Sequence, residues 1–596
     1  MELLNLDGVI EKGVFEIPSY QRGYAWQKEQ LKDFWNDLEH VSKLGDKFHY
    51  MHSLTLRELE NEFESSAFEI IDGQQRLATS LILLGLLAKT TQNKDPKYSL
   101  INLEPILSYK YYGLSEAFRA IMEEEKDLEA FKTSFYAKNL IKAYAFFKEK
   151  ISDTPIETLE KMFDALIKKM LFSVVELNDN RIDSFSSFET INNRGKDLST
   201  LELFKNRLHF VAHKICDEGD LENLQQEIND TYTRIYHDLR FFEDTHLGDF
   251  LKYFVAYYYG EKKDFKERLL NTAFDAHKKY DDLYDEYEKI NDLLLYLSYS
   301  SKVWYFLHTL DDEELRIEIT PKMCGLLDKM RRLNALSDNA FLPLLLSLLT
   351  IQLAVRSGSE RHYTTKELEG LLEYLERFGF LIYGVAGKNT AKNEWIELAF
   401  QAFRAYRSWE DRITIEDLPT LEKNFFKGEH SGLELLEESI HSKKNTEKWY
   451  RWGKALNYLL YEYELYHNPE TTLNFDGSIE SIEHILPQKP DQGYSAKEKS
   501  WAKNPHIVHA LGNLLLIPKN ANSSLSNKPF EEKRKAYLKG SYSEKEVAKN
   551  ASFGIVEIQK RSEKLLDFLI MRYRIAELVG ENAIKAFKNA LLKEIK

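Results

Sequence analysis

Two short apolar runs near the C-terminus limit the possible fold and function of this 596-residue chain more than any other part of its sequence. The first run, S-I-E-H-I-L-P-Q (481–488), carries Glu483 and His484, and the second, L-G-N-L-L-L-I-P, opens with Asn513. Both have the length and apolar character of strands, and the polar stretch around Asn522 favours a helix. The pattern therefore predicts two strands and a helix that bring one His and two Asn side chains to one place.

Residues of these types can cut a phosphodiester bond, since a neutral His takes a proton from water and oxygen ligands hold a hard cation. The arrangement resembles the HNH (His-Me finger) nucleases, which have a ββα-metal fold. The resemblance implies that His484 is the general base and that Asn513 holds its ring in one orientation. It also implies that Glu483 and Asn522 bind Mg²⁺ or Mn²⁺, with Asn520 as a competing candidate. The alternative is that E-H-I-L-P ends a strand and His484 is an ordinary loop histidine.

The segment around these motifs is basic although the chain as a whole is acidic. Between His484 and Gly540 ten Lys or Arg stand against four Asp or Glu, whereas the whole chain has 81 against 96 and a net charge of −15. A local basic surface is what phosphate binding requires. Alternatively, K-R-K (533–535) is a solvated helix face, which could serve both purposes. We expect double-stranded DNA to be bound by Lys519, Lys528, Lys533 and Arg534.

A second group of motifs lies near the N-terminus: I-P-S-Y-Q-R-G-Y-A-W (17–26) and F-E-I-I-D-G-Q-Q-R-L-A-T (68–79). The second motif predicts a strand, a sharp turn at Gly73 and a helix whose first amides can bind an anion. Arg22 and Arg76 add two guanidinium groups suited to phosphate. Asp72 could bind a metal ion or position a water. The alternative is a structural turn followed by a helix start.

A third motif, F-E-T-I-N-N-R-G-K-D-L-S-T-L-E-L-F-K-N-R-L (188–208), places Asn192, Asn193 and Arg194 in a turn before an amphipathic helix with a Ser/Thr cap. A simple helix corner is the alternative. Together the three motifs resemble the ParB/sulfiredoxin-like N-terminal domain of GmrSD-type restriction enzymes. In one respect the chain departs from that family, because His52 occupies a position where its members have a small residue.

This second resemblance implies that the domain binds and hydrolyses ATP or GTP and controls the nuclease. The implied catalytic residues are Asp72 and Arg76. The implied nucleotide-binding residues are Arg22, Asp72, Gly73, Gln74, Gln75, Arg76, Asn193 and Arg194.

Length and composition bound the remaining possibilities. A chain of this length calls for two to four domains, and 43% hydrophobic residues allow large cores. Its two cysteines, Cys216 and Cys324, have no C-x-x-C neighbour, so disulfides and zinc are disfavoured and a reducing cytoplasm is expected. The first residues show no secretory pattern, and the apolar runs 81–88 and 341–355 are too short to span a bilayer.

We expect a predominantly helical α+β protein. Its predicted parts are a ParB/sulfiredoxin-like nucleotide-binding α/β domain (1–200), a helical connector (201–466) and an HNH nuclease domain with closing helices (467–596). The run F-S-V-V-E-L (172–177) is expected to return to the first sheet, and the aromatic stretch 448–466 is expected to be core. A helix over about 28–43 is expected to carry on one face Leu31, Phe34, Trp35 and Leu38.

The sequence thus predicts a cytoplasmic, nucleotide-regulated, metal-dependent endonuclease that cuts or nicks modified phage DNA, as type IV restriction enzymes do. Two alternatives are a nucleotide-binding DNA sensor whose HNH fold does not cleave, and a nuclease toxin that acts on RNA or host DNA. The sequence leaves open the modification, the preferred nucleotide, the direction of regulation and whether the protein is a homodimer.

Overall fold

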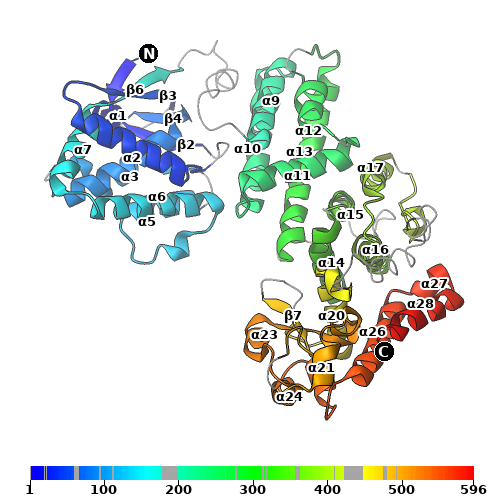
Figure 1. Cartoon of the computed structure of the whole chain (residues 1–596). Coiled ribbons are helices and arrows are strands. Elements are labelled where there is room, and N and C mark those ends of the chain that lie inside the picture. Colours follow the sequence, from blue (N-terminus) through cyan, green and yellow to red (C-terminus); the bar gives the residue numbers. More distant parts are fainter. Residues whose placement is uncertain are drawn as a thin grey trace. The chain divides into compact units, whose positions relative to one another are not determined.

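The computed structural model of the chain is predominantly helical, with one mixed sheet near the N-terminus and a strand pair near the C-terminus (Figure 1), which confirms the expected α+β class. The chain divides into two compact units, Met1–Arg316 with Leu349–Ala354, and Ile317–Leu348 with Val355–Lys596. The division falls inside the predicted connector. The structure describes residues 2–18, 21, 23–59, 66–92, 95–110, 113–177, 199–261, 263–275, 278–311, 315, 319–337, 339–355, 363–408, 410–421, 424, 448–473, 479–490 and 493–595.

The N-terminal sheet has the strand order β1-β6-β3-β4-β2-β5. β3 runs parallel to β6 and antiparallel to β4, and β2 runs parallel to both β4 and β5. β6 pairs with β1 and β3, which confirms that the 172–177 run returns to this sheet. The strands are β1 (Glu2–Asn5), β2 (Val14–Ile17), β3 (His49–Leu59), β4 (Ala67–Asp72), β5 (Leu107–Tyr109) and β6 (Met170–Glu176).

Four helices, α2, α3, α6 and α7, lie side by side against this sheet (Figure 1). α2 buries all four apolar residues of its predicted face, and α3 is buried without interruption from Leu77 to Ala88. The helices here are α1 (Leu6–Lys12), α2 (Lys28–Lys43), α3 (Gln74–Thr90), η1 (Pro96–Tyr98), α4 (Leu100–Leu103), η2 (Glu104–Ile106), α5 (Leu114–Met122), η3 (Glu129–Phe131), α6 (Phe135–Ser152) and α7 (Ile156–Lys168).

The rest of the first unit is helical and begins with a capped helix. The hydroxyl of Ser199 accepts the Glu202 amide, and the Glu202 carboxylate accepts the Ser199 amide at 2.7 Å, which confirms the predicted Ser/Thr cap. The segments are α9 (Thr200–Ile215), α10 (Glu218–Asp238), α11 (Asp244–Tyr259), α12 (Phe265–Glu267), η5 (Arg268–Ala273) and α13 (Leu283–Thr309).

The second unit packs a helical part against the C-terminal strand pair. The first segments are α14 (Pro321–Ser337), α15 (Leu342–Ala354, of which Leu349–Ala354 belongs to the first unit), α16 (Thr365–Phe378), η6 (Gly379–Val385), α17 (Lys392–Ser408), η7 (Ile415–Asp417), η8 (Lys448–Trp452) and α20 (Lys454–His467). The remaining segments are β7 (Glu480–His484), α21 (Ala496–Trp501), α22 (Pro505–Val508), η9 (Leu511–Asn513), β8 (Leu514–Pro518), α23 (Lys519–Leu525), α24 (Phe530–Tyr537), α25 (Tyr542–Ala548), α26 (Ile555–Arg572), α27 (Ile575–Val579) and α28 (Glu581–Lys593).

A buried charge network holds the helices of the second unit together. Glu376 on α16 and Glu462 on α20 are almost fully buried, and the guanidinium of Arg572 on α26 lies 3.1 and 3.0 Å from their carboxylates. Lys329 on α14 lies 2.8 Å from Glu462. Because buried charges require partners, this network fixes α20 and α26, which pack against the strand pair, relative to α14 and α16.

None of the described helices combines the length and the apolar composition that a bilayer crossing requires.

Candidate active site

The C-terminal motif forms two antiparallel strands followed directly by a helix. β7 pairs with β8 so that His484 lies opposite Leu514 and Glu483 lies opposite Leu515. α23 starts at Lys519, the residue after β8 ends. The predicted order of strand, strand and helix over 481–523 is therefore present.

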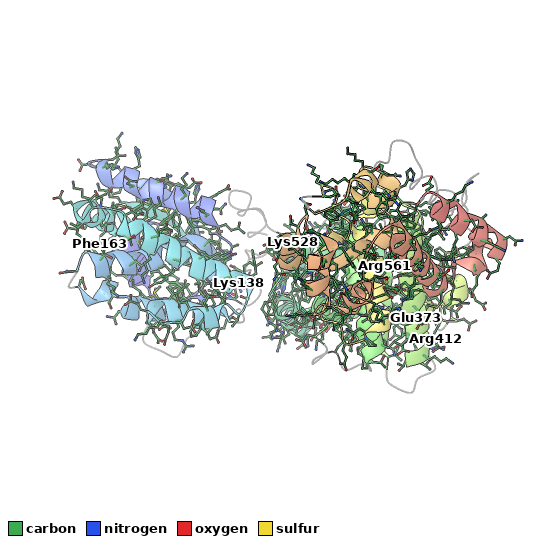
Figure 2. All side chains as sticks on the ribbon, turned by 60° about the horizontal axis from the view of Figure 1, so that its bottom comes forward. Lys138, Phe163, Glu373, Arg412, Lys528 and Arg561 are labelled. Carbon is green, nitrogen blue, oxygen red and sulfur yellow. The ribbon has the colours of Figure 1, made fainter. Side chains whose placement is uncertain are left out.

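Gly512 allows the turn into β8 to lie directly against α26. A Cβ atom at this position would lie 2.0 Å from the carbonyl oxygen of Ile558 and 2.6 Å from the amide nitrogen of Ser562. Arg561 on α26 (Figure 2) donates to the carbonyl oxygens of Gly512 and Leu514 at 2.9 and 2.8 Å. The glycine of the L-G-N motif is therefore required by a backbone-to-backbone approach that fixes where β8 begins.

Asn513 is fully buried and joins two backbone segments. Its Oδ1 accepts the amide of Leu486 at 2.7 Å, and its Nδ2 donates to the carbonyl oxygens of Leu486 and Val508 at 2.9 and 2.7 Å. Leu486 lies two residues after His484, and Val508 lies one residue before His509. The described contacts of Asn513 thus hold the backbone around His484, whereas the sequence predicts contact with the ring itself.

The ring of His484 lies in a buried pocket lined by other rings. Its Nε2 lies 3.0 Å from Nδ1 of His509, and the Gln488 amide nitrogen lies 3.3 Å from its Nδ1. Tyr450 packs against both imidazoles, with centroid distances of 4.9 Å to His484 and 5.7 Å to His509. Burial, followed by the nearby His509 and Lys533, lowers the pKa of His484 to about 3. The ring is therefore neutral near pH 7 and has the basic form that proton abstraction needs.

Sequence reasoning missed two of these residues. His509 lies four positions before Asn513 in the run H-I-V-H-A-L-G-N, so a second His before the L-G-N motif is a signal that was available. Tyr450 belongs to the aromatic stretch expected to be core. Its neighbour Trp449 is indeed buried, but Tyr450 is only half-buried and reaches the His pair.

Glu483 forms a buried ion pair. Its carboxylate accepts Nζ of Lys533 at 2.6 Å and the hydroxyl of Tyr537 at 3.0 Å. Successive strand residues face opposite sides, so Glu483 and His484 project from opposite faces of β7. Burial raises the pKa of Glu483 and lowers that of Lys533, which means that desolvation outweighs their attraction on both sides. The geometry differs from the predicted metal ligand, because Glu483 is already neutralised and does not share a face with His484.

Asn522 ties α23 to β7. Its Nδ2 donates to the hydroxyl of Ser481 at 2.8 Å and to the carbonyl oxygen of Ile482 at 3.0 Å. Asn520 is exposed, and its Oδ1 accepts the amide of Ala521. In the part of the chain that the structure describes, no group of three or more His, Cys, Asp or Glu side chains is arranged to hold a metal ion.

The four basic residues predicted to bind DNA lie in different environments. Lys519 and Lys528 are exposed (Figure 2 labels Lys528). Arg534 is half-buried and donates to the carbonyl oxygen of Ala548 at 2.7 Å. Lys533 has no exposed surface, so the structure places it in the interior beside Glu483 rather than on a surface that DNA could touch.

The second predicted site surrounds the turn between β4 and α3. Gly73 has φ +100°, and a Cβ there would lie 3.0 Å from the carbonyl oxygen of Ser53, so the predicted sharp turn requires glycine. Arg76 Nη2 lies 3.0 Å from the Asp72 carboxylate and donates to the Ser53 carbonyl oxygen at 2.9 Å. The hydroxyl of Ser53 donates to Asp72 at 3.0 Å. The turn therefore brings Asp72 and Arg76 together at the start of α3.

Two of the other predicted nucleotide ligands, Gln74 and Gln75, are the first two residues of α3. Gln75 accepts the amide of Ala25 at 2.8 Å and donates to the carbonyl oxygen of Gly23 at 3.0 Å, so its side chain holds the backbone of these two residues against α3. Gln74 is half-buried at the first position of α3. Arg22, Asn193 and Arg194 lie outside the described residues.

His52 departs from ordinary strand geometry. It is exposed and has φ +66°, and the pairing of β3 with β6 shifts register between Tyr50 and Ser53. A left-handed backbone favours glycine, so this conformation explains a small residue at the position and gives no reason for the histidine.

Both ends of the chain match families of nucleases. Residues 436–568 match the family described as GmrSD restriction endonucleases, C-terminal domain, and residues 3–209 match GmrSD restriction endonuclease, N-terminal domain. The protein is therefore a nuclease, a hydrolase whose partner is DNA. The two matched segments together span more than half of the chain, and it belongs to the GmrSD family of type IV restriction endonucleases. A comparison with curated proteins gave no match.

Proposed function

We propose that this restriction enzyme is a nucleotide-regulated, metal-dependent HNH endonuclease that cuts or nicks modified phage DNA, with His484 as its general base. The observation that carries the proposal is the buried imidazole of His484 at the end of β7, which contacts His509 within the strand, strand and helix motif. Its neighbours Asn513 and His509 lie in the same matched C-terminal domain.

In the proposed reaction His484 takes a proton from a water molecule. The water oxygen then bonds to phosphorus as the bond from phosphorus to the leaving oxygen breaks, and solvent protonates that oxygen. Asn513 contributes indirectly, because it holds the backbone segments on both sides of the histidine pair. General-base catalysis of this kind is worth roughly 10²–10⁴ in rate.

A divalent cation is part of this proposal, and one of its two predicted ligands fits. Asn522 uses its amide nitrogen in both described hydrogen bonds, so its carbonyl oxygen is the atom suited to a cation. Glu483 does not fit, because Lys533 already neutralises it. Magnesium often takes one or two protein ligands and completes its shell with waters and phosphate oxygens. A bound ion would stabilise the charge that develops on the phosphate.

The DNA backbone is proposed to follow the exposed basic side chains of Lys519, the first residue of α23, and Lys528, three residues after its end. The net charge of −15 makes a broad nucleic-acid surface unfavourable and favours such a confined contact.

The nucleotide site is proposed to lie at Asp72, Gly73 and Arg76. Both described hydrogen bonds of Arg76 use Nη2, and a guanidinium group has further N–H donors that suit phosphate oxygens. The first amides of α3 lie beside them and favour an anion. ATP or GTP bound there would change the nuclease activity by preferring one state of the protein.

The first experiment measures plasmid cleavage by wild type, His484→Ala and the control His506→Ala, on modified and plain phage DNA in Mg²⁺ with and without ATP or GTP. We expect His484→Ala to lose cleavage by about 10²-fold or more while it still melts cooperatively and keeps NTP hydrolysis. Near-normal cleavage by folded His484→Ala would contradict the assignment. Binding without cleavage by wild type would instead favour a DNA sensor.

The second experiment tests coupling between the sites. Arg76→Ala is expected to abolish NTP hydrolysis and to remove the effect of nucleotide on cleavage. Lys89→Ala, on the exposed end of the same helix, is the matched control and should change neither. NTP hydrolysis unchanged in Arg76→Ala would remove the nucleotide site from the proposal, and cleavage indifferent to nucleotide in wild type would remove the coupling.

A further inference from the structure

The histidine pair is the contact in the C-terminal domain that the proposed reaction does not yet explain. His484 and His509 are 7% and 8% exposed, and their facing atoms, Nε2 and Nδ1, are 3.0 Å apart. A hydrogen bond between two imidazole nitrogens requires one to carry a proton and the other to offer a lone pair. The direction of this bond therefore decides which nitrogen of His484 is left to act.

The neighbouring amide indicates the direction. The Gln488 Nε2 group is a donor that lies nearer to Nδ1 of His484, at 3.3 Å, than to Nε2, at 3.5 Å, and Nε2 faces His509 at 3.0 Å, so this geometry favours a lone pair on Nδ1. A neutral imidazole with its lone pair on Nδ1 has its proton on Nε2. His484 Nε2 therefore donates to Nδ1 of His509, and Nδ1 of His484 is the atom that can accept a proton.

The surroundings hold this pair in one geometry. Asn513 bonds the segments that follow His484 and precede His509, as described above, so one buried side chain sets the spacing of both rings. Tyr450 lies at 20° to the plane of His509 and covers both imidazoles. The arrangement is suited to orienting His484 rather than to binding substrate.

We propose that His509 is a positioning residue that accepts the Nε2 proton of His484 and so keeps Nδ1 of His484 as the proton-accepting atom. This inference rests on the proposed role of His484 as the base. When a water proton moves to Nδ1, the Nε2 proton stays in the bond to His509, so the imidazolium that forms remains hydrogen-bonded and no second proton has to leave.

The test is a double-mutant cycle in the full-length protein, with single-turnover plasmid nicking, DNA affinity and thermal melting measured for each variant. His509→Leu removes the acceptor, and His509→Gln replaces it by an amide oxygen. His506→Leu is the matched control, because this half-buried histidine lies three residues earlier and pairs with Glu594 instead.

We expect His509→Leu to lower the nicking rate by roughly 10–100-fold with unchanged DNA affinity, as loss of an orienting partner does. His509→Gln should recover most of the rate, and His506→Leu should match wild type. In the His484→Ala background, His509→Leu should cause no further loss, because there is no base left to orient.

Three results would overturn the inference. The first is a wild-type rate in His509→Leu, and the second is a loss of equal size in the His484→Ala background. The third is a loss that appears as weaker DNA binding or a raised Mg²⁺ requirement, which would make His509 a substrate or metal contact. If His509→Leu melts early, His509→Phe, which fills the pocket but offers no hydrogen-bond acceptor, and its His484→Ala double variant decide the same question. A fully active His484→Ala protein would instead contradict the proposed function itself.

Discussion

Replacing Lys533 by Met should destabilise the C-terminal unit strongly, although a surface lysine could be changed without effect. Lys533 has no exposed surface, and its Nζ donates to the Glu483 carboxylate at 2.6 Å and to the carbonyl oxygens of His484 and Ile485 at 2.8 and 3.3 Å. Met has a similar length but no charge and no donor. The substitution therefore leaves a buried carboxylate without its cation.

The magnitude follows from this burial. Removing one member of a buried ion pair costs roughly 3–5 kcal/mol, because the remaining charge is desolvated and unpaired. Desolvation already raises the pKa of Glu483 with Lys533 present, so the unpaired carboxylate will take up a proton at a higher pH still. For a unit of this size, that loss of stability lowers the melting temperature by on the order of 10 °C.

The assay is calorimetry of the full-length protein, with the transition of the C-terminal unit compared between variants. Lys535→Met is the matched control, because Lys535 is exposed on the same helix, and it should change stability by less than about 0.5 kcal/mol. The double variant Glu483→Gln with Lys533→Met should recover part of the loss, since it removes both charges.

Two outcomes would contradict the structural role of this ion pair. If Lys533→Met melts like wild type but binds DNA more weakly and with a smaller salt dependence, then Lys533 faces DNA in the way the sequence predicts. If Glu483→Gln also keeps its stability and raises the Mg²⁺ requirement, then Glu483 is a metal ligand and the ion pair is not a structural one.

Three further results are expected from the same unit. Gly512→Ala should cost about 3 kcal/mol or more, measured by urea unfolding, because the new methyl group meets the α26 backbone; a wild-type midpoint would contradict the described approach. The lowered pKa of His484 means that the unfolded protein binds a proton below about pH 6.5 while the folded one does not, so stability is full above that pH and falls towards pH 3. Between pH 7 and pH 5 the loss is about 2 kcal/mol, and it should be absent in His484→Gln, as urea unfolding at both pH values will show. Asn522→Ala should raise the Mg²⁺ concentration for half-maximal cleavage more than it weakens DNA binding, with Asn520→Ala as the control; the reverse ranking would assign the cation to Asn520.

Local signals predicted the elements of this protein well. The buried face of α2 and the order of strand, strand and helix around His484 follow from periodicity and turn residues within short windows. The glycine turn before α3 was predictable for the same reason, because the steric limits on φ act within a single residue.

The contact partners of the candidate catalytic side chains could not be predicted from local sequence patterns. The sequence places Glu483 next to His484 and suggests a shared role, but the pleat sends them to opposite faces. Lys533 lies within a basic run, K-R-K, that has the composition of a solvated helix face. Its 50-residue separation from Glu483 hides the ion pair from any local pattern.

The sequence by itself determined that this chain carries a strand-end histidine, a glycine turn before α3 and motifs at both ends that support one family assignment. Only the tertiary structure decided that His509 contacts His484 and that Lys533 neutralises Glu483. The physical reason is that turns and periodicity act between neighbouring residues. Burial and ion pairing, by contrast, depend on which distant segments the packing brings together.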